Sequence, residues 1–188
     1  MMQNVVDIRI IEEADIPAVL EIQAVCYTEL TPESNESFHA KLRASQSTCF
    51  IAALEGDVVG YLISLPWEFS SPPALNAETR RLPLSPNCLY LHDLAVTPSA
   101  RRFGTGRALV EAYLAELKGL GLGRASLIAV QGSGPYWERY GFRAVPLAEP
   151  LKDKLASYGE GVRYMELTVQ KTPTMALHAE AHATHERR

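Results

Sequence analysis

The sequence predicts a single α/β domain. Of its 188 residues, 47% are hydrophobic and 21% are charged, a composition typical of one soluble domain with a complete core. Short apolar or alternating runs, which favour strands, are interspersed with longer runs of helical period. The apolar run 89–96 leads through a basic turn with two glycines into the amphipathic run 107–120. This order of strand, turn and helix indicates an α/β arrangement.

The first part of the chain predicts three strands and two helices. Asp15 can cap the start of the first helix, which carries apolar side chains on one face. Glu55-Gly56-Asp57 separates two apolar runs and predicts a hairpin. In order, we expect a strand over residues 6–11, a helix after Asp15, a helix over 36–45, and strands over 49–54 and 58–65.

Residues 66–87 form the one long irregular segment that the sequence predicts. Prolines at positions 66, 72, 73, 83 and 86 rule out a regular helix or a central strand over most of it. Long loops inside compact domains are usually functional or mobile.

The second part of the chain predicts a central strand over 89–96 and a helix over 107–120 that ends in a glycine-rich turn. A strand over 124–130, a short helix over 135–140 and a last strand over 162–169 follow. We expect the domain to span residues 7–171, with a disordered tail over 172–188, because the tail has few large apolar residues. Three tail histidines leave a metal site open, but we interpret the tail as solvated.

The turn RRFGTG, residues 101–106, predicts a binding site for an anionic group. Gly104 and Gly106 let a phosphate approach the backbone, and Arg101, Arg102 and Arg107 add positive charge beside a helix N-terminus. A solvated glycine loop is the alternative for the hexapeptide alone. A P-loop is excluded because no lysine follows either glycine, and a dinucleotide fingerprint is excluded because Leu109 stands at its third glycine position.

The same residues resemble the R/Q-x-x-G-x-G/A acyl-CoA signature of the GNAT superfamily of N-acetyltransferases, here Arg101, Gly104 and Gly106. The wider resemblance covers HDLAVTPSARRFGTGRALV, the strand SLIAV and the segment GPYWERYGF. It implies a mixed, mostly antiparallel sheet of six to seven strands, about four flanking helices and a splayed central strand pair. The segment LHDLAV is similar to the serotonin (arylalkylamine) N-acetyltransferases within this superfamily.

The resemblance implies acetyl-CoA as the acyl donor and no metal. The pantetheine arm would lie between the strands 89–96 and 124–130, on main-chain groups of Leu94, Ala95 and Val96. The pyrophosphate would bind the turn, whose residues are Arg101, Arg102, Phe103, Gly104, Thr105, Gly106 and Arg107.

Acetyl transfer to an amine needs a proton acceptor, because an alkylamine is almost wholly protonated at neutral pH. His92 is the best candidate, since an imidazole is mostly neutral at pH 7. Strand alternation places Tyr90 and His92 on one face and Asp93 on the other. Tyr90 stands where the serotonin enzymes carry the first of two histidines, so a relay of two histidines is not expected. A core histidine is the alternative for His92, and Asp93 is a weaker alternative base.

The departing thiolate needs a proton, and the family often supplies it from a tyrosine at the position of Trp137. An indole is not a usable acid. Tyr136, or else Tyr140, is expected to take this role; the alternatives are that both are core aromatics or that no dedicated acid exists. Ser133 lacks a nucleophile elbow and is expected to cap the short helix, so direct transfer in a ternary complex is favoured.

The favoured acceptor is a small alkyl- or arylalkylamine, and Trp67, Phe69 and Tyr90 are the expected substrate-binding residues. The alternative for Trp67 and Phe69 is an apolar pair that covers the edge of the core. A protein or peptide acceptor, or a catalytically weak module that senses acyl-CoA, are the alternatives. Trp137, at the position where the family often has its proton-donating tyrosine, favours the sensor module.

Composition restricts the partners. A net charge of −4 argues against nucleic acid, and no apolar run reaches the roughly 20 residues that cross a bilayer. The N-terminus lacks the plan of a signal peptide. Cys26, Cys49 and Cys88 are odd in number and lack metal-site spacing, which predicts reduced thiols. We therefore expect a cytoplasmic protein without a membrane partner, and the resemblance leaves a homodimer open.

Overall fold

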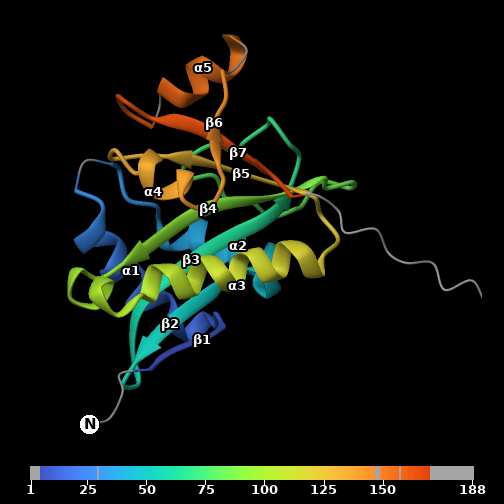
Figure 1. The fold of residues 1–188 in the computed structure, drawn as a ribbon. Coiled ribbons are helices and arrows are strands. Elements are labelled where there is room, and N and C mark those ends of the chain that lie inside the picture. The colour runs from blue at the N-terminus through green and yellow to red at the C-terminus, as the bar shows by residue number, and fades with distance from the viewer. Residues whose placement is uncertain (1–4, 29, 147–148, 157, 170–188) are drawn as a thin grey trace, which may run out of the picture.

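The computed structural model describes residues 5–28, 30–146, 149–156 and 158–169. The expected tail over 172–188 lies outside these residues. Seven strands form one sheet in the order β1-β2-β3-β4-β5-β7-β6 (Figure 1). The strands are β1 (Val6–Ile10), β2 (Phe50–Leu54), β3 (Asp57–Trp67), β4 (Cys88–Val96), β5 (Arg124–Ala129), β6 (Arg143–Ala144) and β7 (Arg163–Thr168).

The sheet is mixed and mostly antiparallel, as the sequence predicts. Every neighbouring pair is antiparallel except β4 and β5, which run parallel. The parallel ladder joins only the pairs from Leu89 with Ala125 to Leu91 with Leu127, although β4 continues to Val96. The central strands therefore part after three residue pairs, which confirms the expected splay.

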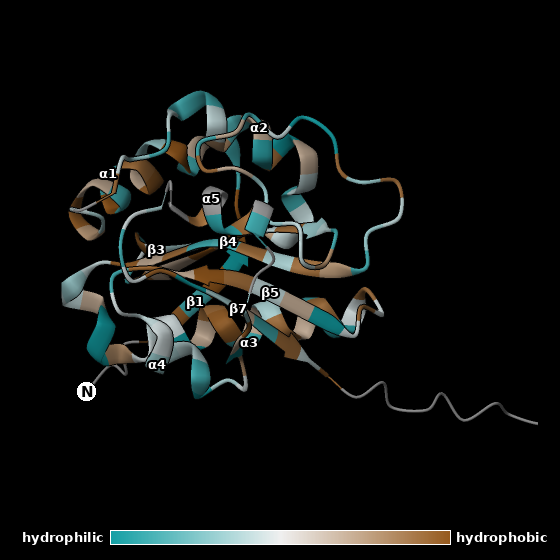
Figure 2. Ribbon diagram, turned by 90° about the horizontal axis from the view of Figure 1, so that it is seen from above, coloured by the Kyte–Doolittle hydropathy of each residue, from teal (hydrophilic) through white to brown (hydrophobic). Residues whose placement is uncertain are grey.

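Helices cover both faces of the sheet (Figure 2). On one face, α1 (Ile16–Cys26) and α2 (Asn35–Ser45) enclose a core with Phe38 and Tyr61. On the other, α3 (Thr105–Gly119) and α4 (Gly134–Glu138) enclose a core with Tyr113 and Trp137. A fifth helix, α5 (Glu149–Ala156), precedes β7. The 3-10 turns are η1 (Glu13–Asp15), η2 (Gln46–Thr48) and η3 (Pro98–Phe103).

Some local expectations were wrong. The Asp15 side chain makes no cap to α1; it accepts hydrogen bonds from the Glu12 backbone N–H at 2.8 Å and from Arg9, because η1 precedes the helix. Strand β3 continues through Pro66 and Trp67, at its end, where a missing N–H is tolerated. The sequence analysis did not identify α5 or the two-residue β6, which gives five helices instead of four.

Strand β4 carries a bulge at His92. Ile63 of β3 pairs with Asp93 and Ser64 pairs with Leu91, so His92 has no partner on β3. A bulge shifts the alternation of side chains by one residue. Leu91 and Leu94 accordingly both belong to the core beneath α3. The expectation that Asp93 faces away from His92 was therefore wrong: both side chains lie on the face covered by α1 and α2.

Gly60 allows α3 to pack closely on the sheet. A Cβ at Gly60 would lie 3.1 Å from the Ala95 carbonyl oxygen and 3.3 Å from Leu109 Cδ1. We expect Gly60→Ala to lower the free energy of unfolding by roughly 1–3 kcal/mol through overpacking. Gly119→Ala, in open space at the end of α3, should raise it by up to about 1 kcal/mol. Urea unfolding measures both variants against the wild type. Equal free energies of unfolding for Gly60→Ala and the wild type would contradict the packing account.

Candidate active site

A cavity of about 730 Å³ occupies the gap between β4 and β5. One wall is the outer half of β4, from Leu91 to Val96, and the opposite wall is formed by Leu127 and Ile128 of β5. One end reaches the turn between η3 and α3, and the other reaches the segment between α1 and α2. The parting of the central strands thus creates a channel with two chemically different ends.

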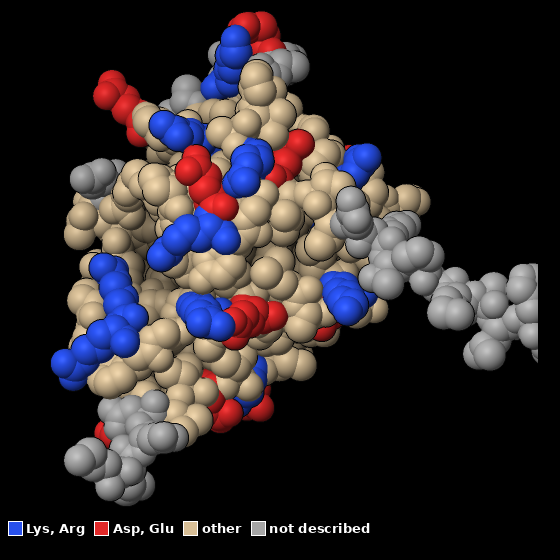
Figure 3. All heavy atoms as spheres, viewed as in Figure 1, with Lys and Arg blue, Asp and Glu red and all other residues tan. Residues whose placement is uncertain are grey.

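The turn at the first end has the geometry of an anion site. Gly104 has φ +76°, in the left-handed region, and links η3 to α3 without a side-chain cap. The first-turn N–H groups of α3 have no intrahelical partner and can bind an anion. Thr105 Oγ1 donates to the Ala100 carbonyl at 2.9 Å and fixes the turn. Basic side chains gather over η3, at the left of Figure 3.

Of the seven turn residues expected to bind the donor, four line the cavity: Arg101, Gly104, Gly106 and Arg107. The Arg102 guanidinium lies over the Phe103 ring at 4.7 Å, and Thr105 is buried beneath the turn. Arg107 pairs with Glu111 at 2.7 Å on the surface of α3.

Leu94, Ala95 and Val96 all line the cavity. The Leu94 carbonyl accepts a hydrogen bond from the Tyr27 hydroxyl at 3.0 Å, and the Val96 carbonyl accepts one from Arg101 Nε at 3.1 Å. Side chains therefore donate hydrogen bonds to β4 carbonyls that would bond to β5 if the two strands stayed paired.

His92 lies at the second end of the cavity, with its side chain 2% exposed. Its Nε2 is 2.9 Å from Oε2 of Glu33, in the segment between α1 and α2. Its Nδ1 is buried and has no hydrogen-bond partner among the described residues. One ring nitrogen is thus in close contact with a carboxylate oxygen, without the alignment of a hydrogen bond, and the other has no partner among the described residues.

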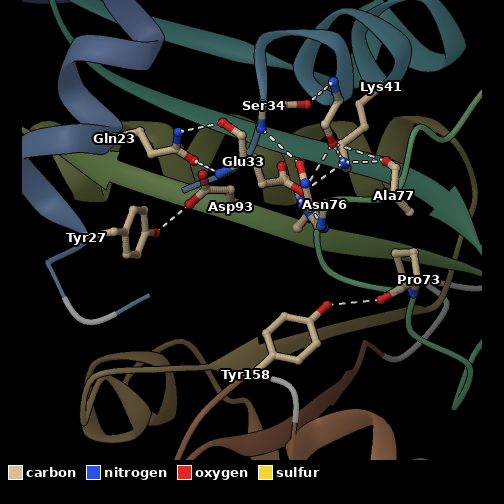
Figure 4. A network of polar contacts seen from close by, with 12 residues as sticks. Gln23, Tyr27, Glu33, Ser34, Lys41, Pro73, Asn76, Ala77, Asp93 and Tyr158 are labelled. Carbon is tan, nitrogen blue, oxygen red and sulfur yellow. Dashed lines mark hydrogen bonds and ion pairs between the residues drawn. The ribbon is translucent and has the colours of Figure 1, made fainter. Parts of the chain in front are cut away.

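Glu33 is a site residue that the sequence analysis missed. Its Oε1 accepts hydrogen bonds from Lys41 Nζ at 2.9 Å and from the Asn76 backbone N–H at 2.8 Å (Figure 4). Burial opposes ionisation, but the contact with His92 and the charge and hydrogen bond of Lys41 outweigh it, so the pKa of Glu33 falls from 4.5 to about 2. No local sequence signal distinguishes this glutamate from the exposed ones, because its partners come from β4, α2 and the 66–87 segment.

Asp93 is occupied by two phenols. Its Oδ2 accepts a hydrogen bond from Tyr61 at 2.6 Å, and its Oδ1 accepts one from Tyr27. Burial raises the pKa of Asp93, although both phenol hydrogen bonds favour the carboxylate. This carboxyl group is directed at α1 and β3 and not at His92.

Tyr136 and Tyr140 line the cavity near its first end. A Cβ at Gly106 would lie 2.9 Å from the Tyr136 hydroxyl, so this phenol sits against the start of α3. Tyr140 donates to the Tyr136 hydroxyl at 3.4 Å, and burial raises the pKa of Tyr136. Trp137 is buried, and Ser133 occupies the N-cap of α4 without a side-chain cap.

Trp67, Phe69 and Tyr90 are not among the described residues that line the cavity. Trp67 lies at the opposite end of β4, paired with Cys88, and Phe69 packs under the Arg124 guanidinium at 4.8 Å. Tyr90 is 1% exposed, with its ring 5.9 Å from that of His92. Instead, Leu75 and Leu30 supply the apolar wall at the second end.

Comparison with known proteins identifies the family. Residues 16–142 match the acetyltransferase (GNAT) family, and the chain therefore belongs to it. The chain is an acetyl-CoA-dependent acetyltransferase. The search of curated proteins found no match.

Among the described residues, no group of three or more His, Cys, Asp or Glu side chains could hold a metal ion. No helix in that part of the chain is long and apolar enough to cross a membrane.

Several solved structures share the fold. The loading GNATL domain of CurA from Lyngbya majuscula has a TM-score of 0.72 at 13% identity, covering 90% of this chain and 100% of that one. Ribosomal-protein-S18-alanine N-acetyltransferase from Escherichia coli has a TM-score of 0.66 at 19% identity, covering 92% and 99%. Ard1 from Thermoplasma volcanium has a TM-score of 0.66 at 17% identity, covering 88% and 98%.

The Gly106 position tests the donor end. We expect Gly106→Ala to weaken CoA binding at least tenfold in calorimetry, because the new methyl group displaces Tyr136 and crowds the turn. Gly106→Ala with Tyr136→Phe should regain part of the loss, since the contacting hydroxyl is gone. Gly119→Ala, in the same helix with nothing within 4 Å of the new methyl group, is the matched control and should keep the wild-type affinity. Unchanged CoA affinity in Gly106→Ala would contradict this assignment.

The lowered pKa of Glu33 predicts a stability that depends on pH. Its contribution is complete above pH 4.5 and is lost as the pH falls toward 2. Glu33→Gln should lose about 3–5 kcal/mol at pH 7, because Lys41 is left buried without its carboxylate. The difference from wild type should shrink between pH 4.5 and 2 in denaturant titrations. A constant difference over this range would contradict the assignment.

Proposed function

We propose that this member of the GNAT family transfers an acetyl group from acetyl-CoA to a small primary alkyl- or arylalkylamine, by direct attack in a ternary complex. The observation that carries the proposal is the single cavity that joins the glycine turn to His92 and Glu33. One end suits a pyrophosphate, and the other suits an amine that arrives as a cation. The reacting atoms would meet between the two ends, beside β4.

Polarity and enclosure at the second end support a small amine. His92 and Glu33 offer polar groups there, and Leu30 and Leu75 offer apolar surface to a carbon chain or ring. Tyr158 lines the cavity and donates to the Pro73 carbonyl at 3.0 Å, which joins the segment before β7 to the 66–87 segment. We expect this bridge to leave less room for an extended peptide than for a small amine. The likeness of LHDLAV to the serotonin enzymes points to the same substrate class.

The residues at the second end fit the proton transfer. The amine must lose a proton; His92 lines the cavity, and its Nδ1 is buried and without a partner among the described residues. The ammonium group first gives one proton to His92, and the neutral nitrogen then attacks the thioester carbonyl carbon. The C–S bond breaks, CoA leaves as a thiolate, and the second proton released by the nitrogen is balanced by protonation of this thiolate. Tyr136 and Tyr140 are the α4-side phenols that line the cavity for this step.

A protein or peptide acceptor is the second candidate, favoured by the structural likeness to a ribosomal-protein-S18-alanine N-acetyltransferase. A CoA-binding sensor is the third, favoured by Trp137 at the usual tyrosine position. Cytoplasmic location and homodimerisation stay predictions from the sequence.

An acceptor screen tests the proposal. Purified protein is incubated with acetyl-CoA and either alkylamines, arylalkylamines or short peptides, and CoA release is followed. We expect turnover of small amines and a loss of about 10²- to 10⁴-fold in kcat/KM for His92→Gln. His39→Gln, which removes a histidine outside the cavity, should keep wild-type activity. Peptide turnover alone would select the second candidate, and CoA binding without any turnover would select the third.

A further inference from the structure

We propose that Glu33 is a positioning residue for the reaction: its carboxylate holds the Nε2–H of His92, so that Nδ1 is the proton acceptor, and Lys41 holds Glu33 in place. The inference rests on the proposed function, because it assigns the proton to His92. It adds a residue from outside β4 to the machinery. It also explains why two opposite charges are buried at one end of the cavity.

Glu33 is fixed through both its backbone and its side chain. Its backbone N–H donates to Gln23 Oε1 at 2.9 Å, and its carbonyl accepts from Gln23 Nε2 at 3.0 Å. On the side chain, Oε1 takes the bonds from Lys41 and Asn76 and a longer one from Ser37 at 3.3 Å. Oε2 has no hydrogen-bond partner among the described residues and lies 2.9 Å from His92 Nε2. The carboxylate therefore has one occupied oxygen and one directed at the imidazole.

Lys41 has its three donor positions filled. It is fully buried and donates to Glu33 Oε1 at 2.9 Å, to Ser37 Oγ at 2.5 Å and to the Ala77 carbonyl at 2.9 Å. A buried ion pair adds little stability over apolar residues of similar volume. Its effect here is to keep the carboxylate ionised and oriented next to His92.

The other titratable groups around His92 are already engaged. Asp93 is the neighbouring carboxyl group, and both of its oxygens accept from phenols. The phenols around His92 and Glu33 come from the residue after α1, from β3, from β4 and from the segment before β7: Tyr27, Tyr61, Tyr90 and Tyr158. Burial raises the pKa of each, so they stay neutral. Among the described residues, Glu33 is the only carboxylate in contact with the imidazole.

The arrangement has two chemical consequences. A carboxylate at Nε2 favours the tautomer with its proton on Nε2, which leaves the lone pair on Nδ1. The same negative charge stabilises the imidazolium that forms when Nδ1 accepts the amine proton, as in the orienting role of a carboxylate in a catalytic triad. Loss of Glu33 therefore affects the chemical step and its pH dependence, and leaves the donor end unchanged.

Kinetics of Glu33→Gln test the inference. We expect kcat to fall by about 10²- to 10⁴-fold with little change in the KM for acetyl-CoA, and the acid limb of kcat/KM to move to lower pH. The double variant with Glu33→Gln and Lys41→Met should show the same losses without a buried unpaired charge. Asp15→Asn, which breaks the Arg9–Asp15 ion pair away from the cavity, is the matched control and should keep the wild-type profile. A wild-type kcat and acid limb in the double variant would overturn the inference.

Nitrogen NMR of the histidine rings separates this inference from the proposed function, because it needs no acceptor. His92→Gln identifies the resonances of this ring among those of the five histidines. We expect the Nε2–H tautomer in wild type and in Asp15→Asn, and a mixed tautomer that titrates at lower pH in both Glu33 variants. The same tautomer and the same titration in all of them would overturn the inference even if amines are acetylated. Wild-type protein that shows the tautomer but acetylates no amine would instead overturn the proposed function.

Discussion

Strand β4 loses its partner on one side after Leu91, and the cavity follows from this loss. Backbone groups that leave a sheet must find other partners when they are buried. Here the carbonyls of Leu94 and Val96 are satisfied by Tyr27 and Arg101, side chains from α1 and from the turn. The strand thus stays extended along β3 while its other edge faces an open channel. The donor turn and the buried ion pairs are both placed by this one strand.

The bulge at His92 determines which chemistry the strand presents. Without it, alternation would place His92 and Asp93 on opposite faces of the sheet. With it, both lie toward α1 and α2, where two phenols occupy Asp93 and Glu33 pairs with His92. Two adjacent acid–base groups therefore receive separate partners. The result is one saturated carboxyl group and one imidazole with a nitrogen available.

The donor half of the site could be predicted from the sequence, and the acceptor half could not, for a physical reason. The turn is local: Arg101, Gly104 and Gly106 lie within six residues, and the left-handed φ of Gly104 is the conformation that glycine supplies. The acceptor end is assembled from distant segments. Glu33 contacts His92 and Lys41 only because α1, α2 and β4 pack together, and no pattern in the residues near Glu33 predicts these contacts.

The position of the bulge in β4 could not be predicted from the sequence either. Residues 89–96 were correctly predicted as a central strand, because their apolar pattern is strong. The pattern does not show where the register with β3 slips by one residue, since both faces of β4 are buried and a shift leaves apolar residues on either side. Trp67 and Phe69 illustrate the converse: their sequence position beside the long segment suggested a substrate wall, but β3 extends through Trp67 and places it at the opposite end of β4.

The contacts of Glu33 connect acceptor selection to proton transfer. The carboxylate that faces His92 also accepts a hydrogen bond from Asn76, next to Leu75 in the cavity wall, and Asn76 Oδ1 accepts from Ser34 at 2.9 Å at the start of α2. The 66–87 segment is therefore held at its cavity-lining point by the residue that orients the imidazole. Apolar wall positions such as Leu30 and Leu75 can change the shape offered to the amine without breaking these bonds. A change in the backbone path near Asn76, by contrast, would alter the acceptor wall and the orientation of His92 together.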